Sequence, residues 1–258
     1  MFHEGWSKHM KNRIIGKQVV SLLSTDSTND YARQMLEGDH PREGLVIIAG
    51  EQKKGRGYGQ NTWYSGRGKN LLFTVILYPE FLAANQQFLI SKAVSLGIYD
   101  YLSEYISDVS IKWPNDIYVE DRKIAGMLIE NDLVGSAFKD SIVGIGLNVN
   151  QEYFPEEIPN PVSLLQMIEK KLPLKKELRK LCGYLDKRYG MLSRGHVDKI
   201  NREYHSNLFR LNQMSWYQSQ ERSFRAKIVG VSDYGQLILE NEAGKTLEYN
   251  FKEVEFML

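Results

Sequence analysis

The chain has 258 residues, of which 42% are hydrophobic, 25% charged and 11% aromatic. This composition is too apolar for a disordered chain and too polar for a membrane protein, and the length suits one or two domains with a substantial core. The 33 basic side chains are matched by 32 acidic ones, so the net charge of +1 provides no general attraction to nucleic acid or an anionic membrane. Any electrostatic binding must therefore be local.

Cys182 is the single cysteine, so it cannot form an internal disulfide, and its helical surroundings are typical of a buried apolar thiol. The first dozen residues lack the apolar stretch of a signal peptide, and the longest apolar run, residues 71–78, is far too short to span a membrane. We therefore expect a cytoplasmic protein without membrane contacts. Residues 1–10 are interpreted as an extension to which no function is assigned.

The first part of the chain alternates between strand and helix patterns. A strand is predicted over 18–23, and a Ser/Thr/Asn-rich turn then offers N-caps for a helix that stops at Gly38. Apolar strand patterns at 44–50 and 71–78 flank a long, glycine-rich, basic loop. Apolar residues at helical spacing predict the main helix over 84–106.

Short strands follow in quick succession at 109–112, 116–119, 123–130 and 141–149. A turn at 120–122 joins the middle two, which predicts an antiparallel hairpin. These patterns favour an α+β fold, in which a mixed β-sheet carries helices on one side.

The C-terminal part changes character twice. From 161 to about 208 the pattern is helical, and its basic run is interpreted as a solvated helix face. After residue 212 the apolar residues alternate in short stretches, which indicates a small β-barrel. We therefore expect two domains, 1–211 and 212–258, packed against each other.

Common signatures of nucleotide, zinc and serine-hydrolase chemistry are absent from the sequence. Functional groups concentrate instead in 52–63, 112–116, 121–130 and 144–150. Alternating glycines in the first segment let backbone N–H groups approach an anion, and Arg56 adds a planar fork of donors. A tight surface turn would show the same glycine pattern, and the other segments also allow structural turns, so the residues alone leave both readings open.

In this order the segments resemble the biotin protein ligases, which attach biotin to a lysine of carboxylase carrier domains. The resemblance is carried by Ser-Thr-Asn at 27–29, the Gly-Arg-Gly loop ending in Trp63, and the sequences KWPND, DRKIAG and GIGLN. It implies a mixed-sheet catalytic domain followed by an SH3-like barrel. About seventeen residues precede the first predicted strand, too few for the DNA-binding domain of some members, so we expect no binding to DNA.

The resemblance implies an ATP-dependent reaction in two steps. Biotin and ATP give biotinyl-5'-AMP and pyrophosphate, and a lysine of a biotin carboxyl carrier protein then accepts the biotinyl group. The catalytic residues that it implies are Lys123 and Arg56, and Asp116 is the implied ligand of the Mg²⁺ that accompanies ATP.

The family's ligand contacts can be carried over to matching positions of this sequence. Biotin binding is implied for Ser27, Thr28, Asn29, Gln52, Gly55, Arg56, Gly57, Tyr58, Lys123 and Gly126. Binding of ATP and the adenylate is implied for Arg56, Trp63, Lys112, Asn115, Asp116, Lys123 and Asn148.

One segment departs from the family pattern. Tyr58-Gly59-Gln60-Asn61 is neutral where the family loop is basic, so fewer positive charges are available to hold the adenylate. This departure keeps open the alternative of a non-catalytic biotin-binding protein. A lipoate or octanoate protein ligase also stays open, because that group shares the fold and the adenylate chemistry. The sequence also leaves open whether the chain forms a homodimer.

Overall fold

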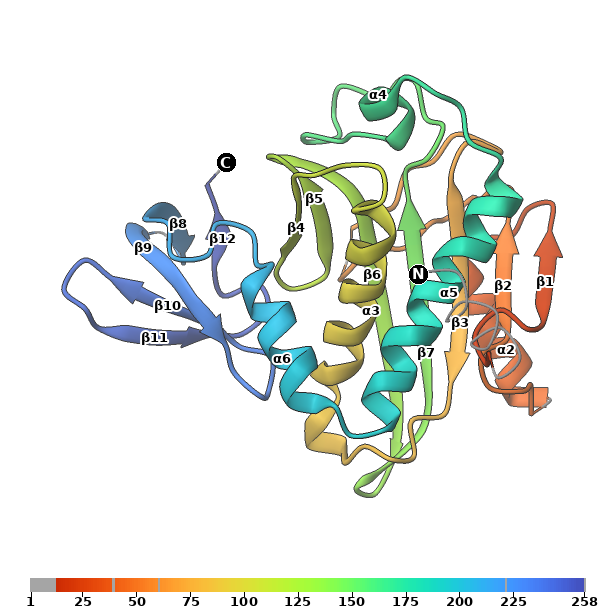
Figure 1. Ribbon diagram of the computed structural model, residues 1–258, viewed down its shortest axis with the longest axis horizontal. Coiled ribbons are helices and arrows are strands. Elements are labelled where there is room, and N and C mark those ends of the chain that lie inside the picture. Colours follow the sequence, from red (N-terminus) through yellow and green to blue (C-terminus); the bar gives the residue numbers. More distant parts are fainter. Residues whose placement is uncertain (1–12, 39, 60, 221, 258) are drawn as a thin grey trace, which may run out of the picture.

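The computed structural model describes residues 13–38, 40–59, 61–220 and 222–257 (Figure 1). The extension expected at residues 1–10 lies outside these residues, and so does Gln60 of the neutral loop segment. Within the described ranges, no helix is both long and apolar enough to cross a membrane.

A seven-stranded mixed sheet forms the larger part of the molecule, in the spatial order β1-β2-β3-β7-β6-β5-β4. Strands β1 and β2 run parallel, and every other neighbouring pair is antiparallel. Strand β3 is buried along its whole length because both of its faces are covered. The strands are β1 (Val19–Leu22), β2 (Val46–Ala49), β3 (Leu71–Leu77), β4 (Val109–Lys112), β5 (Asp116–Val119), β6 (Arg122–Val134) and β7 (Ala137–Leu147).

Helices cover both faces of this sheet. Helices α3 (Phe88–Leu102) and α5 (Leu174–Ser193) lie on one face, and α6 (Val197–Ser206) packs against α3 (Figure 1). Helix α2 (Thr28–Gly38) packs on the opposite face, where Ala32 joins an apolar cluster with side chains of β2, β3 and β7. The α+β class and the mixed sheet are thus confirmed. Helices were expected on one side of the sheet, whereas α2 covers the other face. Two short helical segments, η2 (Ala84–Gln86) and α4 (Leu164–Ile168), complete this part.

A five-stranded antiparallel sheet follows near the C-terminus, in the order β11-β10-β9-β8-β12. Its strands are β8 (Ser215–Ser219), β9 (Arg222–Val231), β10 (Leu237–Asn241), β11 (Thr246–Tyr249) and β12 (Glu255–Phe256). The Trp113 indole N–H donates to the Gly235 carbonyl at 2.8 Å, and both sheets contribute side chains to one apolar core. The domain boundary between residues 211 and 212 stays a prediction.

Candidate active site

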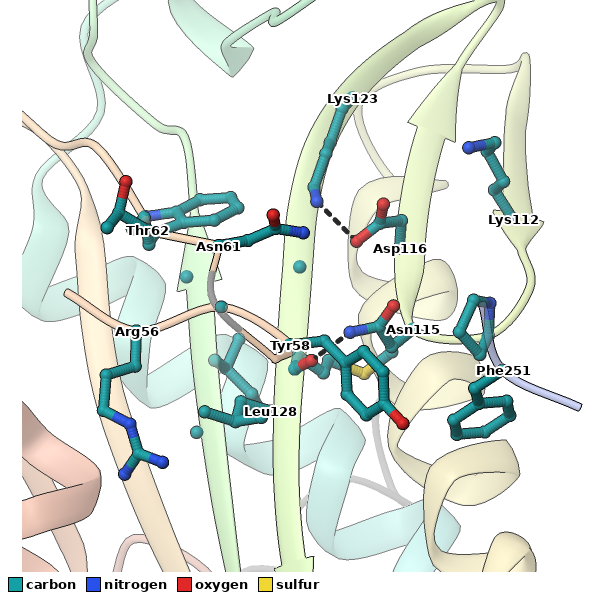
Figure 2. Close-up of a pocket in the computed structure, with 18 of the residues that line it drawn as sticks. Arg56, Tyr58, Asn61, Thr62, Lys112, Asn115, Asp116, Lys123, Leu128 and Phe251 are labelled. Carbon is teal, nitrogen blue, oxygen red and sulfur yellow. Dashed lines mark hydrogen bonds and ion pairs between the residues drawn. The ribbon is translucent and has the colours of Figure 1, made fainter. Parts of the chain in front are cut away.

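A cavity of about 350 Å³ opens on the sheet face that carries α2 (Figure 2). Five parts of the chain line it: the start of α2, the glycine-rich loop, the turn before β5, strands β6 and β7, and the segment 251–256. Of the predicted site residues, Gly55 and Asn148 are not on its wall. The others are: Ser27, Thr28, Asn29, Gln52, Arg56, Gly57, Tyr58, Trp63, Lys112, Asn115, Asp116, Lys123 and Gly126.

One end of the cavity is built from neutral hydrogen-bonding groups at the start of α2. The Ser27 hydroxyl accepts from the Asp30 backbone N–H at 3.4 Å, so Ser27 is the N-cap that the sequence offers. The backbone N–H and the hydroxyl of Thr28 both donate to Gln52 Oε1, at 2.7 and 2.9 Å. Because its oxygen is held by the helix, the Gln52 amide directs its Nε2 donors away from α2.

A buried threonine supports this end from below. Thr74 Oγ1, in the middle of β3 and fully buried, lies 2.8 Å from Thr28 Oγ1 and 2.7 Å from Asn29 Oδ1. The Asn29 amide also donates to Glu130 Oε2 at 2.8 Å. A Cβ at Gly144 would lie 2.3 Å from Asn29 Oδ1, so that glycine makes room for the Asn29 side chain. Sequence reasoning missed Thr74, although it is the one polar residue in an otherwise apolar strand pattern.

The other end of the cavity depends on a β-bulge in β6. Opposite β5, Gly126 pairs with Asp116, but Lys123 pairs with Tyr118, so Ile124 is an extra residue on β6. In a regular strand, Lys123 and Gly126 would face opposite sides of the sheet. The bulge instead turns Ile124 into the core and brings Lys123 to the cavity wall beside Asp116.

Lys123 and Asp116 form an ion pair, with 2.6 Å between Nζ and Oδ1 (Figure 2). A second ammonium, that of Lys112, lies over the rings of Tyr118 and Phe256, at 5.0 and 4.7 Å from their centres. Burial lowers the pKa of Lys112 below its ordinary value. The turn before β5 is tied to β6 by the Asn115 amide, which donates to the Met127 carbonyl at 2.6 Å. Two cations and a carboxylate therefore meet at this end.

The indole of Trp63 lies beside the cationic end, with Lys123 Nζ 5.5 Å from its ring centre, on a floor made by two glycines. A Cβ added at Gly126 would lie 2.9 Å from Trp63 Cζ3, and one at Gly146 would lie 2.4 Å from Cε2. The indole nitrogen of Trp63 is buried without a hydrogen-bond partner in the described part of the chain. The glycines of the sequence GIGLN thus accommodate the side chains of Asn29 and Trp63.

The glycine-rich loop folds back on itself as a small hairpin, here called the loop hairpin, of which residues 55–59 and 61–63 are described. The N–H of Gly57 donates to the Asn61 carbonyl at 2.8 Å, and the N–H of Trp63 donates to the Gly55 carbonyl at 2.9 Å. Gly55 contributes to this pairing, because a Cβ there would lie 2.5 Å from the Trp63 oxygen.

Arg56 leaves the hairpin in the direction away from Lys123 and Asp116 (Figure 2). Its guanidinium is paired with Asp30 at 2.7 Å and with Glu130 at 3.2 Å. Partial burial opposes its charge, but these carboxylates outweigh that effect and raise the pKa of Arg56. The expected contact of Arg56 with phosphate stays a prediction.

Asn148 lies just behind the cavity and is 3% exposed. Its amide nitrogen donates to the Val162 carbonyl at 3.1 Å, whereas Oδ1 is buried without a hydrogen-bond partner among the described residues. Its contact with an adenylate also stays a prediction.

A magnesium ion would find one carboxylate at the cationic end, that of Asp116. No group of three or more metal-ligating side chains occurs among the residues that the structure describes. This set fits Mg²⁺ brought by a nucleotide, because that ion commonly takes one or two carboxylates and completes its shell with phosphate oxygens and water.

Several cavity residues were not foreseen. Some lie inside the recognised segments but were given no ligand contact, among them Asn61, Thr62, Leu128 and Gly144. Others come from the C-terminal segment, among them Phe251, Lys252 and Glu255. The C-terminal members reach the cavity only through packing between the two sheets, for which the local sequence carries no signal.

Residues 22–148 match the biotin/lipoate A/B protein ligase family. The bifunctional ligase/repressor BirA of Bacillus subtilis (strain 168) is 27% identical over 241 residues, which cover 91% of this chain and 73% of BirA. The biotin–protein ligase of Homo sapiens is 26% identical over 264 residues, which cover 95% of this chain and 35% of the human protein.

Solved structures show the same similarity. The biotin protein ligase from Aquifex aeolicus in complex with biotin and ATP superimposes with a TM-score of 0.77 at 26% sequence identity. The match covers 93% of this chain and 99% of the Aquifex chain, so it includes both sheets.

Proposed function

Because this chain belongs to the biotin/lipoate A/B protein ligase family, we propose that it activates biotin with ATP and transfers the biotinyl group to a lysine of a biotin carboxyl carrier protein. One observation carries the proposal: a single cavity joins a neutral hydrogen-bonding end to a cationic end. Biotin has the matching chemistry, since its ring system is polar but uncharged and its chain ends in a carboxylate.

The neutral end suits the ring system of biotin. Uncharged polar groups are bound selectively by donors and acceptors fixed in advance. Ser27, Thr28 and Gln52 meet this condition, because the N-cap contact and the bonds between Thr28 and Gln52 hold their side chains in place.

The cationic end suits the first chemical step. The biotin carboxylate attacks the α-phosphorus of ATP, the bond to the β-phosphate breaks, and pyrophosphate leaves. Both reactants are anionic, so the step needs positive charge at the reacting oxygens. Lys123 supplies this charge, and its ion pair with Asp116 supports the role because it holds the ammonium at the cavity wall.

The metal that accompanies ATP would neutralise charge on the departing pyrophosphate. Asp116 would hold it together with phosphate oxygens. Lys112 adds a second positive charge at the same end, and its contacts with Tyr118 and Phe256 limit its freedom.

In the second step the amine of the carrier lysine attacks the carbonyl carbon of the mixed anhydride. The bond from that carbon to the phosphate oxygen breaks, AMP leaves, and the new amide nitrogen loses its proton. Lys123 again faces the developing negative charge on the phosphate.

Mass spectrometry tests the substrate directly. The purified protein is mixed with magnesium-ATP and either biotin or lipoate, and acyl-adenylate is measured before any carrier is added. We expect biotinyl-adenylate, followed by transfer to an apo biotin carboxyl carrier domain. Lipoyl-adenylate alone would move the chain to lipoate ligation, and no adenylate with either acid would identify a binding protein.

A further inference from the structure

The tip of the loop hairpin contacts the C-terminal sheet region. The Tyr58 ring meets the Phe251 ring edge-on, with 5.6 Å between centroids (Figure 2). The Lys252 ammonium lies 5.4 Å from the centre of the Tyr58 ring. Edge-to-face rings and a cation over a ring are both attractive arrangements. Tyr58 therefore joins the tip to a segment that lies far from it in the sequence.

The docking side of this contact is partly buried and packs against the core. Phe251 also packs against Trp113 at 5.2 Å and Phe88 at 6.1 Å between centroids. The indole N–H of Trp113 is in turn bonded to the Gly235 carbonyl. By contrast, Tyr58 is 38% exposed. A packed aromatic cluster thus receives a side chain from a loop.

Besides the ion pairs of Arg56 with Asp30 and Glu130, the hairpin has two aromatic points of attachment among the described residues. Its backbone bonds between Gly57 and Asn61 and between Gly55 and Trp63 make it a small unit of its own. Trp63 attaches its base to the glycine floor of β6 and β7, and Tyr58 attaches its tip. Gly59 lets the chain turn at the tip, since its φ of 68° is unfavourable for residues with a Cβ.

We propose that Tyr58 is a positioning residue that closes the loop hairpin over the cavity by docking on Phe251 and Lys252. Segment 58–61 is neutral where the family loop is basic. In this chain, the aromatic contact of Tyr58 would thus take the place of those positive charges in keeping the ligand bound. Closure depends on the C-terminal segment. The closed hairpin is a property of the ligand-free protein. Its effect on the release of an adenylate rests on the proposed function.

Amide hydrogen exchange of the ligand-free protein tests closure without any chemistry. We expect Tyr58→Ala to speed exchange in a peptide covering residues 55–63 by about 2- to 12-fold, the range expected for loss of one edge-to-face pair. Tyr58→Phe keeps the ring and should exchange like the wild type. Tyr64→Ala is the matched control, since Tyr64 is an exposed aromatic residue (46%) of the same segment.

A double-mutant cycle identifies the docking partner. Phe251→Leu keeps an apolar side chain in the core but removes the ring, and we expect Tyr58→Ala to have no further effect on exchange in that background. Thermal unfolding checks that each variant is folded. Unchanged exchange in Tyr58→Ala, or additive effects of the two substitutions, would overturn the proposal.

A second readout measures ligand retention. Biotinyl-adenylate formed on the protein is chased with unlabelled biotin and ATP, and its release should quicken by a similar factor in Tyr58→Ala but not in Tyr58→Phe. Equal release rates in the three proteins would refute a role in retention. If no adenylate forms in the wild type, the proposed function fails, and hydrogen exchange still decides the closure.

Discussion

Gly126 pairs with Gly146 across strands β6 and β7, and the two missing side chains leave the space that the Trp63 indole fills. Through this space, the Trp63 indole attaches the loop hairpin to the sheet. The hairpin base can lie flat against the strands only while both positions lack a Cβ.

Gly146→Ala should therefore weaken ligand binding. Its methyl group would fall 2.4 Å from Trp63 Cε2, so the indole must move and carry the hairpin with it. Overpacking of this kind typically costs about 1–3 kcal/mol. We expect ATP and biotin to bind about 5- to 150-fold more weakly by isothermal titration, if that cost falls on the ligand-binding state. Gly183→Ala on α5 is the control, because its nearest neighbour would lie 4.0 Å away, and normal ligand affinity in Gly146→Ala would contradict the role of the floor.

Lys123→Ala should lower adenylate formation by about 10²- to 10³-fold, since one contact to developing charge typically has that effect on rate. Pyrophosphate release is the measurement. Lys123→Arg should retain part of the activity because it keeps the charge, and Lys139→Ala, which changes an exposed lysine of β7, should be normal. Turnover near the wild-type rate in Lys123→Ala would remove this residue from the chemistry.

Thr74→Val should destabilise the protein and weaken biotin binding together. Valine has nearly the same shape, but it leaves Asn29 and Thr28 without the buried hydroxyl, at a typical cost of about 1–3 kcal/mol. Urea unfolding measures the change. Thr246→Val, on an exposed strand, should stay within about 0.5 kcal/mol of wild type. Equal stabilities of the two variants would show that the Thr74 hydroxyl is dispensable.

Cys182 should resist alkylation in the folded protein. Burial raises the pKa of its thiol to about 11, so at pH 8 only about one thiol in a thousand is ionised. We expect iodoacetamide to label it rapidly only in denaturant. Fast labelling of the native protein at pH 8 would contradict this.

The same shift has a consequence for stability. The folded state keeps the thiol proton to a higher pH than the unfolded state, whose pKa is near 9.0. The contribution of Cys182 to the free energy of unfolding is thus present below pH 9 and is lost as the pH rises towards 11. The stability difference between wild type and Cys182→Ala should shrink over that interval.

Much of the fold could be predicted because its elements carry local signals. The N-cap residues before α2, the apolar run of β3 and the turn at 120–122 all lie where their patterns placed them. The full lengths of β6 and β7 could not be predicted, because residues 131–140 mix polar and apolar side chains without a strand-like alternation and turn back as a hairpin around Gly135. Strand β12 has two residues, too few for any periodicity.

The candidate site divides in the same way. Motifs contiguous in sequence supplied most of the cavity wall. Thr74, which supports the wall from behind, and Phe251, which lines it, come to the site through tertiary packing alone. Arg56 was expected to face phosphate, and its observed partners, Asp30 and Glu130, come from α2 and β6. Pairing between distant charged side chains has no local signature in the sequence.

The bulge at Ile124 limits how this sheet can be redesigned. A strand with strict alternation would turn the Lys123 ammonium toward the apolar core beneath α3 and point Ile124 into the cavity. A redesign that made the β5–β6 pairing regular while keeping every residue would thus bury the Lys123 ammonium without a partner. Deleting Ile124 would also make β6 regular, but it would leave Lys123 on the cavity face. Only the deletion should therefore keep the Lys123 ammonium at the site.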